Sequence, residues 1–202
     1  MRCTLILVIL LTAPQAQAED PPWIDAICTV SAGSSRGTGV IISEDNGVGH
    51  LLTNHHVVGR VVNVSCKWIN GYALRGTVVW KDKGADQALV RLSVPRGVST
   101  LPVARKGERP RQGENVQLAG FGGTSGKLTV WNGVVNGYLE SSKGAHQIEV
   151  NVNSISGDSG GAIIFNGKLA AVLWGGPVKN GRMYATRGTI AQYAADFCTG
   201  LT

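Results

Sequence analysis

Short runs of β-forming residues, separated by turn residues, dominate the chain from residue 26 onward. Apolar and polar residues alternate within several runs, as at Val62, Val64 and Cys66, which is the pattern of a strand with one buried face. Glycine, asparagine, aspartate and serine gather between the runs, and these residues favour tight turns. The pattern therefore predicts a protein built mainly from short β-strands.

The runs form two sets of six. They are predicted at 26–31, 37–43, 50–53, 61–69, 73–81 and 88–94, and then at 115–120, 128–139, 147–152, 162–165, 168–174 and 183–186. The stretch 95–113 holds three prolines, four arginines and little apolar periodicity, which is typical of a connector between two lobes. With no helical pattern between the strands, an all-β pair of closed sheets is predicted rather than a βαβ fold.

The two ends of the chain have different patterns. Residues 189–202 repeat apolar residues at helical spacing, and Thr189 with Gln192 has the spacing of a capping box, so a C-terminal helix is predicted. Residues 1–18 have the pattern of a signal peptide: a basic start, an apolar run and a small-residue cleavage site. That run is too short to span a bilayer, which takes about 20 apolar residues. We expect a mature protein that starts at Glu19, is secreted or periplasmic, and is not membrane-bound.

Composition adds little to this picture, apart from 28 glycines that suit many short strands joined by turns. The net charge of +6 comes from scattered residues, except for Arg105-Lys106 and the stretch 109–111. We interpret that cluster as a solvated linker, and we expect no nucleic-acid partner. Removal of the first 18 residues leaves Cys28, Cys66 and Cys198, an odd number that predicts one pair and one free thiol in an oxidising compartment.

Candidate chemistry lies in the stretch Ser156-Gly157-Asp158-Ser159-Gly160-Gly161 between two predicted strands. A serine hydroxyl becomes a nucleophile when a base takes its proton and nearby donors stabilise the oxyanion. The flanking glycines allow a tight turn and close approach of a substrate backbone. Upstream, residues 51–58 supply a histidine at a strand end, and residues 85–90 supply an aspartate at a strand start.

These three segments resemble the trypsin-like, chymotrypsin-fold serine proteases, whose motifs are Thr-x-x-His-x-Val, Asp-x-Ala-Leu and Gly-Asp-Ser-Gly-Gly, in that order. The form Leu-Thr-Asn-x-His-Val-Val is most similar to the bacterial HtrA-like branch. The resemblance implies two six-stranded antiparallel β-barrels, at 19–94 and 114–188, joined by the connector 95–113 and closed by a helix at 189–202. The 43 residues after Ser159 leave no room for a PDZ domain.

By the same resemblance, His56 rather than His55 is the general base, and Asp86 rather than Asp82 orients it. An ordinary imidazole titrates near pH 6.5, which suits both acceptance and return of a proton. Gln87 replaces the aliphatic residue usual after the aspartate, at an expected cost in packing.

Ser159 is then the expected nucleophile, with the backbone N–H groups of Gly157 and Ser159 as the oxyanion hole. In the zymogen branch of the family, a freshly cut N-terminal amine pairs with the acid at the position of Asp158. No Ile-Val-Gly-Gly start is visible here, so another donor or a cation is expected to satisfy Asp158.

The resemblance also implies a primary substrate pocket formed by the segment before Ser159, by Leu173-Trp174-Gly175 and by the strand near Arg182. Asn153 falls where a trypsin carries the aspartate that binds Arg or Lys, so cleavage after basic residues is not expected. Two interpretations of Arg182 stay open: it pairs with an acidic substrate side chain, or it faces solvent and the pocket takes small or medium apolar groups. We favour the second. The strands that carry Cys28 and Cys66 are neighbours in the resembling fold, which implies a disulfide between them and a free Cys198.

The expected function is a secreted, monomeric serine endopeptidase acting on polypeptides without metal or cofactor. Two alternatives use the same fold: an esterase with the same triad, and a binding module without catalysis. The Gly-x-Ser-x-Gly elbow of α/β-hydrolases is excluded, because it requires a histidine after the serine and all four histidines precede Ser159. A zinc site formed by His50, His55, His56 and Cys66 fits no standard ligand spacing.

Overall fold

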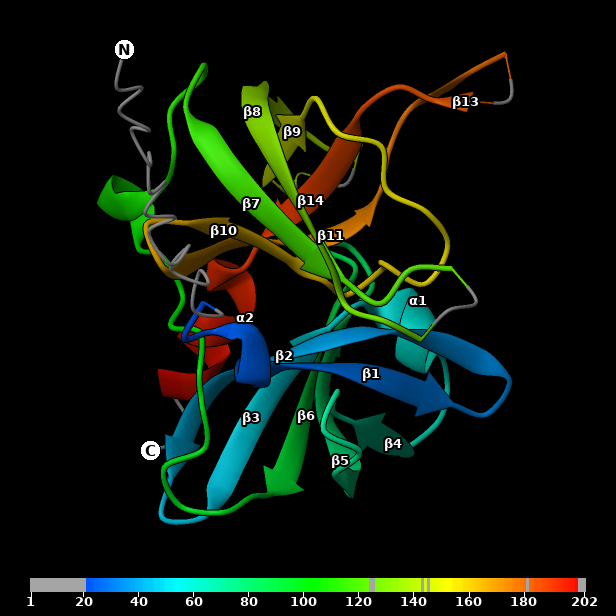
Figure 1. The fold of residues 1–202 in the computed structure, drawn as a ribbon, viewed down its shortest axis with the longest axis vertical. Coiled ribbons are helices and arrows are strands. Elements are labelled where there is room, and N and C mark those ends of the chain that lie inside the picture. The colour runs from blue at the N-terminus through cyan, green and yellow to red at the C-terminus, as the bar shows by residue number, and fades with distance from the viewer. Residues whose placement is uncertain (1–20, 124–125, 143, 145, 181, 200–202) are drawn as a thin grey trace, which may run out of the picture.

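The computed structural model describes the backbone of residues 21–123, 126–142, 144, 146–180 and 182–199, and their side chains except at 182, 195 and 197–199. Two closed barrels of six antiparallel strands each confirm the predicted fold class. Figure 1 shows the barrels stacked along the long axis, with the N-terminal barrel below.

The N-terminal barrel has the strand order β1-β2-β3-β6-β5-β4 and closes through β1 and β4. Its strands are β1 (Ile27–Ala32), β2 (Ser35–Asp45), β3 (Val48–Thr53), β4 (Asn63–Lys67), β5 (Ala73–Asp82) and β6 (Gln87–Ser93). Two short helices belong to this half: η1 (Ile24–Ala26) precedes β1, and α1 (His55–Val58) follows β3. The predicted alternation in β4 holds for Val64 and Cys66, which are buried, whereas Val62 precedes the strand and is exposed.

The C-terminal barrel repeats this strand order. Its strands are β7 (Asn115–Gly120), β8 (Thr129–Glu140), β9 (His146–Val150), β10 (Ala162–Phe165), β11 (Lys168–Gly175) and β14 (Thr186–Ile190). The short strands β12 (Val178–Lys179) and β13 (Arg182–Met183) form a separate hairpin that extends from the barrel in Figure 1. The connector between the barrels contains the short helix η2 (Lys106–Glu108).

The end of the chain differs from the prediction. The last barrel strand was predicted at 183–186 and the helix from residue 189, but β14 continues to Ile190, and α2 (Gln192–Thr199) begins after it. The reason is pairing: Thr189 pairs with Gln147, and Ile190 pairs with Ala171, so both residues are needed to complete the barrel. The helix then packs against β6 of the N-terminal barrel.

The core consists of three layers, because the strands at the junction of the barrels are buried on both faces. Neighbouring residues alternate between a barrel interior and the interface: Leu51 and Val90 fill the N-terminal barrel, whereas Leu52 and Leu89 pack against the C-terminal one. Strands buried on both sides are continuously apolar, which explains unbroken runs such as Ala88-Leu89-Val90. Removing this surface from water is worth roughly 25 cal/mol per Å².

The disulfide predicted between Cys28 and Cys66 is not present in the structure, where both are buried free thiols. They lie on the adjacent strands β1 and β4, as expected, but Cys66 pairs directly with Val30, so that Cys28 is its diagonal neighbour. Diagonal Cα atoms in a sheet lie about 7–8 Å apart, whereas most disulfides span about 4.4–6.8 Å. Burial raises the pKa of Cys28, and contact with the Cys66 thiol raises it further. The side chain of Cys198 lies outside the described residues.

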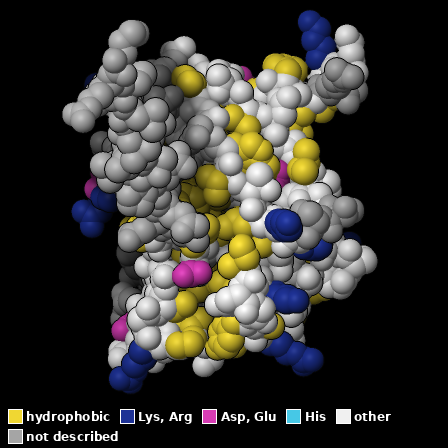
Figure 2. Space-filling view, viewed as in Figure 1, with side chains coloured by type: hydrophobic (Ala, Val, Ile, Leu, Met, Phe, Trp, Pro, Cys, Tyr) yellow, Lys and Arg dark blue, Asp and Glu magenta, His cyan; other side chains and the backbone are white. Residues whose placement is uncertain are grey.

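On the face drawn in Figure 2, some Lys and Arg side chains lie at the edges and several others lie right of the centre. Hydrophobic side chains run as a band over the middle of that face. None of the described helices is long and apolar enough to cross a membrane.

Candidate active site

His56 and Asp86, predicted as base and acid, form a doubly bonded pair. The His56 ring nitrogen Nδ1 lies 2.7 Å from Oδ2 of Asp86, and the His56 backbone N–H donates to Oδ1 over 3.0 Å. This pairing fixes both the position of the ring and its tautomer: Nδ1 carries the proton, and Nε2 is left as the basic nitrogen. His55 makes no such contact in the described part of the chain.

The backbone at Asp86 is held in an uncommon shape. Its φ is +53°, a left-handed conformation that non-glycine residues adopt only where their surroundings enforce it. The buried side chain of Asn54 donates to the Asp86 carbonyl over 2.9 Å, which ties the aspartate to the start of α1. Asp82, the competing acid in the sequence, instead accepts the N–H groups of Gly84 and Ala85 and shapes the turn before Asp86.

In the turn 157–161, which carries Ser159, two amides bond none of the described residues. The others are bonded: those of Asp158, Gly160 and Gly161 donate to the carbonyls of Ile155, Leu173 and Asp158 over 3.1, 2.7 and 2.8 Å. Among the described residues, no hydrogen bond uses the N–H of Gly157 or of Ser159. These are the two donors predicted for the oxyanion hole.

His56 and Asp86 line a cleft of about 360 Å³ together with Trp174, the residue whose carbonyl the Ser159 hydroxyl binds. The Ser159 hydroxyl donates to the Trp174 carbonyl over 3.4 Å, and the described residues include no hydrogen bond between Ser159 and His56. Trp174 sits at a β-bulge in β11, because the pairing with β14 passes from Leu173 directly to Gly175. The bulge turns the tryptophan out of the regular ladder beside the cleft, and its indole N–H is buried without a partner in the described structure.

Thr38 joins the nucleophile turn to the opposite barrel, a role that the sequence analysis missed. Its N–H donates to the Ser159 carbonyl over 2.7 Å, and its hydroxyl donates to the Gly157 carbonyl over 2.9 Å. The same hydroxyl accepts the N–H of Phe121. Gly37 is the feature of the sequence that could have indicated this contact, because a glycine inside a strand often marks the close approach of another backbone. A Cβ at Gly37 would lie 2.6 Å from the Ser159 carbonyl.

Asp158 is fully buried and points away from solvent. The sequence analysis expected a donor for Asp158 without identifying it. The structure shows that the backbone N–H of Ile155 donates to Oδ2 of Asp158 over 2.8 Å, while Oδ1 has no hydrogen-bond partner among the described residues. Burial raises the pKa of the carboxyl, and the amides of Ile155 and Gly122 offset only part of that effect.

The residues predicted for substrate binding separate into different roles. The side chain of Leu173 is buried in the C-terminal barrel, and its backbone bonds Gly160 and Gly161 on the turn that carries Ser159. Trp174 lines the cleft, Gly175 lies beside it in β11, and Asn153 is exposed in the segment before Ser159. Arg182 belongs to β13, and its side chain lies outside the described residues.

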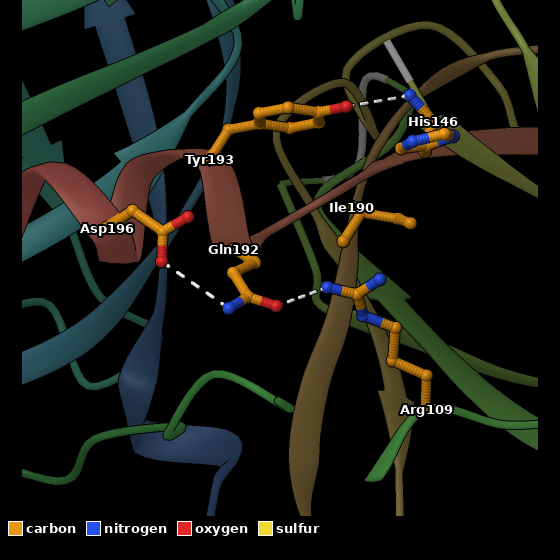
Figure 3. A pocket seen from close by; sticks show the side chains of 6 residues that line it. All are labelled: Arg109, His146, Ile190, Gln192, Tyr193 and Asp196. Atoms are coloured by element: carbon orange, nitrogen blue, oxygen red, sulfur yellow. Dashed lines mark hydrogen bonds between the residues drawn. The ribbon is translucent and has the colours of Figure 1, made fainter. Parts of the chain in front are cut away.

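A second pocket, of about 160 Å³, lies where α2 meets β9 and the connector (Figure 3). Its polar groups bind one another: Arg109 donates to Gln192, Gln192 donates to Asp196, and the Tyr193 hydroxyl accepts the His146 N–H. No group of three or more His, Cys, Asp or Glu in the described part of the chain could hold a metal ion.

The family model for the trypsin-like peptidase domain matches residues 37–172, which include all three triad candidates. The chain belongs to the trypsin-like peptidase family. The periplasmic serine endoprotease DegP of Escherichia coli K12 is 28% identical over 141 residues, which cover 67% of this chain and 29% of DegP. A serine protease HtrA-like protein of Staphylococcus aureus is 29% identical over 153 residues, covering 68% of this chain and 20% of that protein.

Solved structures agree on the fold of this family. The serine endoprotease from Yersinia pestis superposes with a TM-score of 0.73 at 21% identity, covering 89% of this chain and 64% of that one. An inactive form of Rv3671c from M. tuberculosis H37Rv gives 0.72 at 20% identity, covering 88% and 87%. The chain spans less than a third of the length of the two curated relatives named above.

Proposed function

We propose that this protein is an exported serine endopeptidase with His56, Asp86 and Ser159 as its catalytic triad. The observation that carries the proposal is the double contact between Asp86 and His56, at a cleft lined also by Trp174, whose carbonyl accepts the Ser159 hydroxyl. The amides of Gly157 and Ser159, which bond none of the described residues, support it independently, because they are the donors that an oxyanion needs.

The reaction follows from these contacts. His56 Nε2 takes the Ser159 proton as Oγ attacks the scissile carbonyl, and Asp86 stabilises the resulting imidazolium without accepting its proton. The tetrahedral oxyanion accepts hydrogen bonds from the N–H groups of Gly157 and Ser159. The intermediate collapses, His56 returns the proton to the leaving amine, and the acyl-enzyme remains. Water activated by His56 then hydrolyses the ester and restores Ser159.

The proposed substrate is a polypeptide in extended form, with its backbone beside β11 at Trp174. The bulge there takes Trp174 out of the regular ladder with β14, which leaves its backbone to pair with a substrate. The primary pocket is proposed to take small or medium apolar side chains, because Asn153 supplies no negative charge for Arg or Lys.

Export is proposed from the signal-like residues 1–18 and is supported by the periplasmic relatives. We further propose that the mature protein is a monomer that needs no cofactor. Mass measurement of the protein purified from culture medium or periplasm, with N-terminal sequencing, tests both the cleavage after Ala18 and the oligomeric state.

The decisive experiment treats mature protein and its Ser159→Ala variant with a fluorophosphonate probe and with a peptide library. Probe labelling and peptide cleavage, both absent from the variant, support the endopeptidase. Labelling with hydrolysis of esters but not of peptides identifies an esterase. A folded protein that neither labels nor cleaves is a binding module, and this result overturns the proposal.

A further inference from the structure

Gln87, the residue after Asp86, bridges the two barrels. Its side chain is fully buried, and its Nε2 donates to the carbonyls of Thr189 over 3.2 Å and Ile190 over 2.9 Å. These acceptors follow Gln87 by 102 and 103 positions and lie at the end of β14 in the C-terminal barrel. The expectation that Gln87 merely weakens packing was therefore incomplete, because the amide makes specific hydrogen bonds.

Burial of a primary amide at this position costs free energy unless its polar groups are hydrogen-bonded. The residues that follow it, Ala88-Leu89-Val90, are fully buried and apolar, and a buried amide group without partners costs about 1–3 kcal/mol. Both side-chain N–H groups of Gln87 find acceptors, whereas Oε1 has no partner in the described part of the chain. An aliphatic side chain would fill this space without leaving an unpaired oxygen, so packing alone does not account for the glutamine.

The acceptors of this bridge lie on an anchored element. Figure 3 shows Ile190 at the end of β14, with Gln192 just beyond it held by Arg109 from the connector. One residue further on, the Tyr193 hydroxyl accepts the His146 N–H from β9. The glutamine thus binds a part of the C-terminal barrel that is itself fixed from two sides.

We propose that Gln87 is a positioning residue that holds Asp86, and through it His56, in register with Ser159 on the opposite barrel. This inference rests on the proposed endopeptidase function. The left-handed backbone of Asp86 needs outside support. Asn54 supplies that support within the N-terminal barrel, and Gln87 supplies it across the interface.

The bridge also has a counterpart on the other side of the triad. Thr38 binds the carbonyl of Ser159 itself across the same interface. One inter-barrel bond therefore lies at the nucleophile, and a second lies one residue from the acid. Thr189, an acceptor for Gln87, also lines the cleft that contains His56 and Asp86. A small shift between the barrels would move the base from its partner, and misplacement by about 1 Å can cost about 100-fold in rate.

The test is Gln87→Leu, which keeps the volume close and removes the donors, with Gln117→Leu on β7 as a matched control. We expect Gln87→Leu to fold, to lower kcat about ten- to hundredfold and to change KM less than about twofold. The acidic limb of its kcat/KM profile should move to lower pH, because a loosened Asp86 stabilises the imidazolium less. The control Gln117→Leu should match the wild type in kcat, in KM and in the position of the acidic limb. Wild-type kcat and an unmoved acidic limb in a folded Gln87→Leu protein overturn the proposal.

Two further measurements keep the inference testable if the leucine variant does not fold or wild type proves inactive. Gln87→Glu can still donate one hydrogen bond when protonated, so its activity relative to wild type should fall as pH rises; a constant ratio counts against the proposal. Proton NMR at low field reports the His56 Nδ1–H bonded to Asp86 without any turnover. This signal should be sharp in wild type and in Gln117→Leu, and broadened or lost in the Gln87 variants. An unchanged signal in the Gln87 variants refutes the positioning role. A wild-type protein without activity refutes only the proposed function.

Discussion

The backbone N–H of Thr38 donates to the carbonyl of Ser159 over 2.7 Å, although the two residues belong to different barrels. The Thr38 hydroxyl donates to Gly157 on the same turn. Its own carbonyl accepts the Thr53 hydroxyl, two residues before His55. The strand that carries Thr38 therefore connects the segment leading to the proposed base with the turn of the proposed nucleophile.

Thr38→Val should damage both stability and turnover, because valine keeps the shape but removes the hydroxyl. The Phe121 N–H and the Gly157 carbonyl would lose their partners in a buried site, at about 1–3 kcal/mol for each unpaired group. Urea unfolding in a Ser159→Ala background, which prevents self-digestion, measures the free-energy loss. A variant as stable as its parent would mean that the hydroxyl bonds contribute nothing.

The triad predicts that Ser159→Ala and His56→Ala abolish peptide cleavage while leaving the far-UV circular dichroism unchanged. Asp86→Asn should lower kcat by about 10⁴, because the imidazole then adopts the wrong tautomer. His55→Ala is the matched control for the neighbouring histidine and should retain most activity. Inactivity of His55→Ala with activity in His56→Ala would reverse the assignment of the base.

Gly160→Ala should destabilise the fold far more than Gly167→Ala. Both glycines have positive φ, so both substitutions introduce left-handed strain, of about 1–2 kcal/mol. At Gly160, however, a Cβ would lie 1.9 Å from the Thr38 carbonyl, whereas nothing lies within 4 Å at Gly167. We expect the difference in unfolding free energy to exceed about 2 kcal/mol. Equal losses of unfolding free energy in the two variants would show that the contact between Gly160 and the Thr38 carbonyl can rearrange at little cost.

Asp158→Asn should raise stability in a pH-dependent way. The pKa of Asp158 is raised from 3.8, so the folded protein holds this proton more tightly than the unfolded chain does. The cost of the buried charge is absent below the unfolded pKa and develops as pH rises through the folded pKa. Measured in the Ser159→Ala background, the asparagine variant should therefore be more stable near pH 8, with the difference vanishing toward about pH 4. A difference that is the same at all pH values would exclude titration of Asp158 as its cause.

Cleavage preference can be measured with peptides that differ only in the residue before the scissile bond. We expect Val and Leu to be cleaved faster than Glu, and Arg to be cleaved slowest, because Asn153 supplies no ion pair for a buried guanidinium. Preferred cleavage after Arg would contradict this picture of the pocket. A strong Glu preference that disappears in Arg182→Ala would instead assign Arg182 to the pocket.

The hydrophobic pattern of the sequence predicted two closed sheets, and the motifs, through the family that they resemble, implied six-stranded barrels and the pairing of His56 with Asp86. Periodicity and turn residues are local signals, so they placed most strands within a few residues. They were wrong at Thr189 and Ile190, where helical spacing predicted a helix. Both residues instead extend the strand that closes the second barrel. The structure does not contain the predicted disulfide between Cys28 and Cys66, for a related reason. Their strands are neighbours as expected, but the register of the two strands decides whether the cysteines lie opposite each other or diagonally.

Only the tertiary structure decided how the two barrels are fixed to each other around the site. The bonds of Thr38 to Ser159 and of Gln87 to Ile190 join residues more than 100 positions apart, and no local pattern encodes such a partner. Leu173 shows the same limit, since no local pattern indicates that its side chain fills a barrel while its backbone bonds the turn of Ser159. A strand fixes the alternation of its side chains, but which face meets the site depends on how the closed sheets pack together.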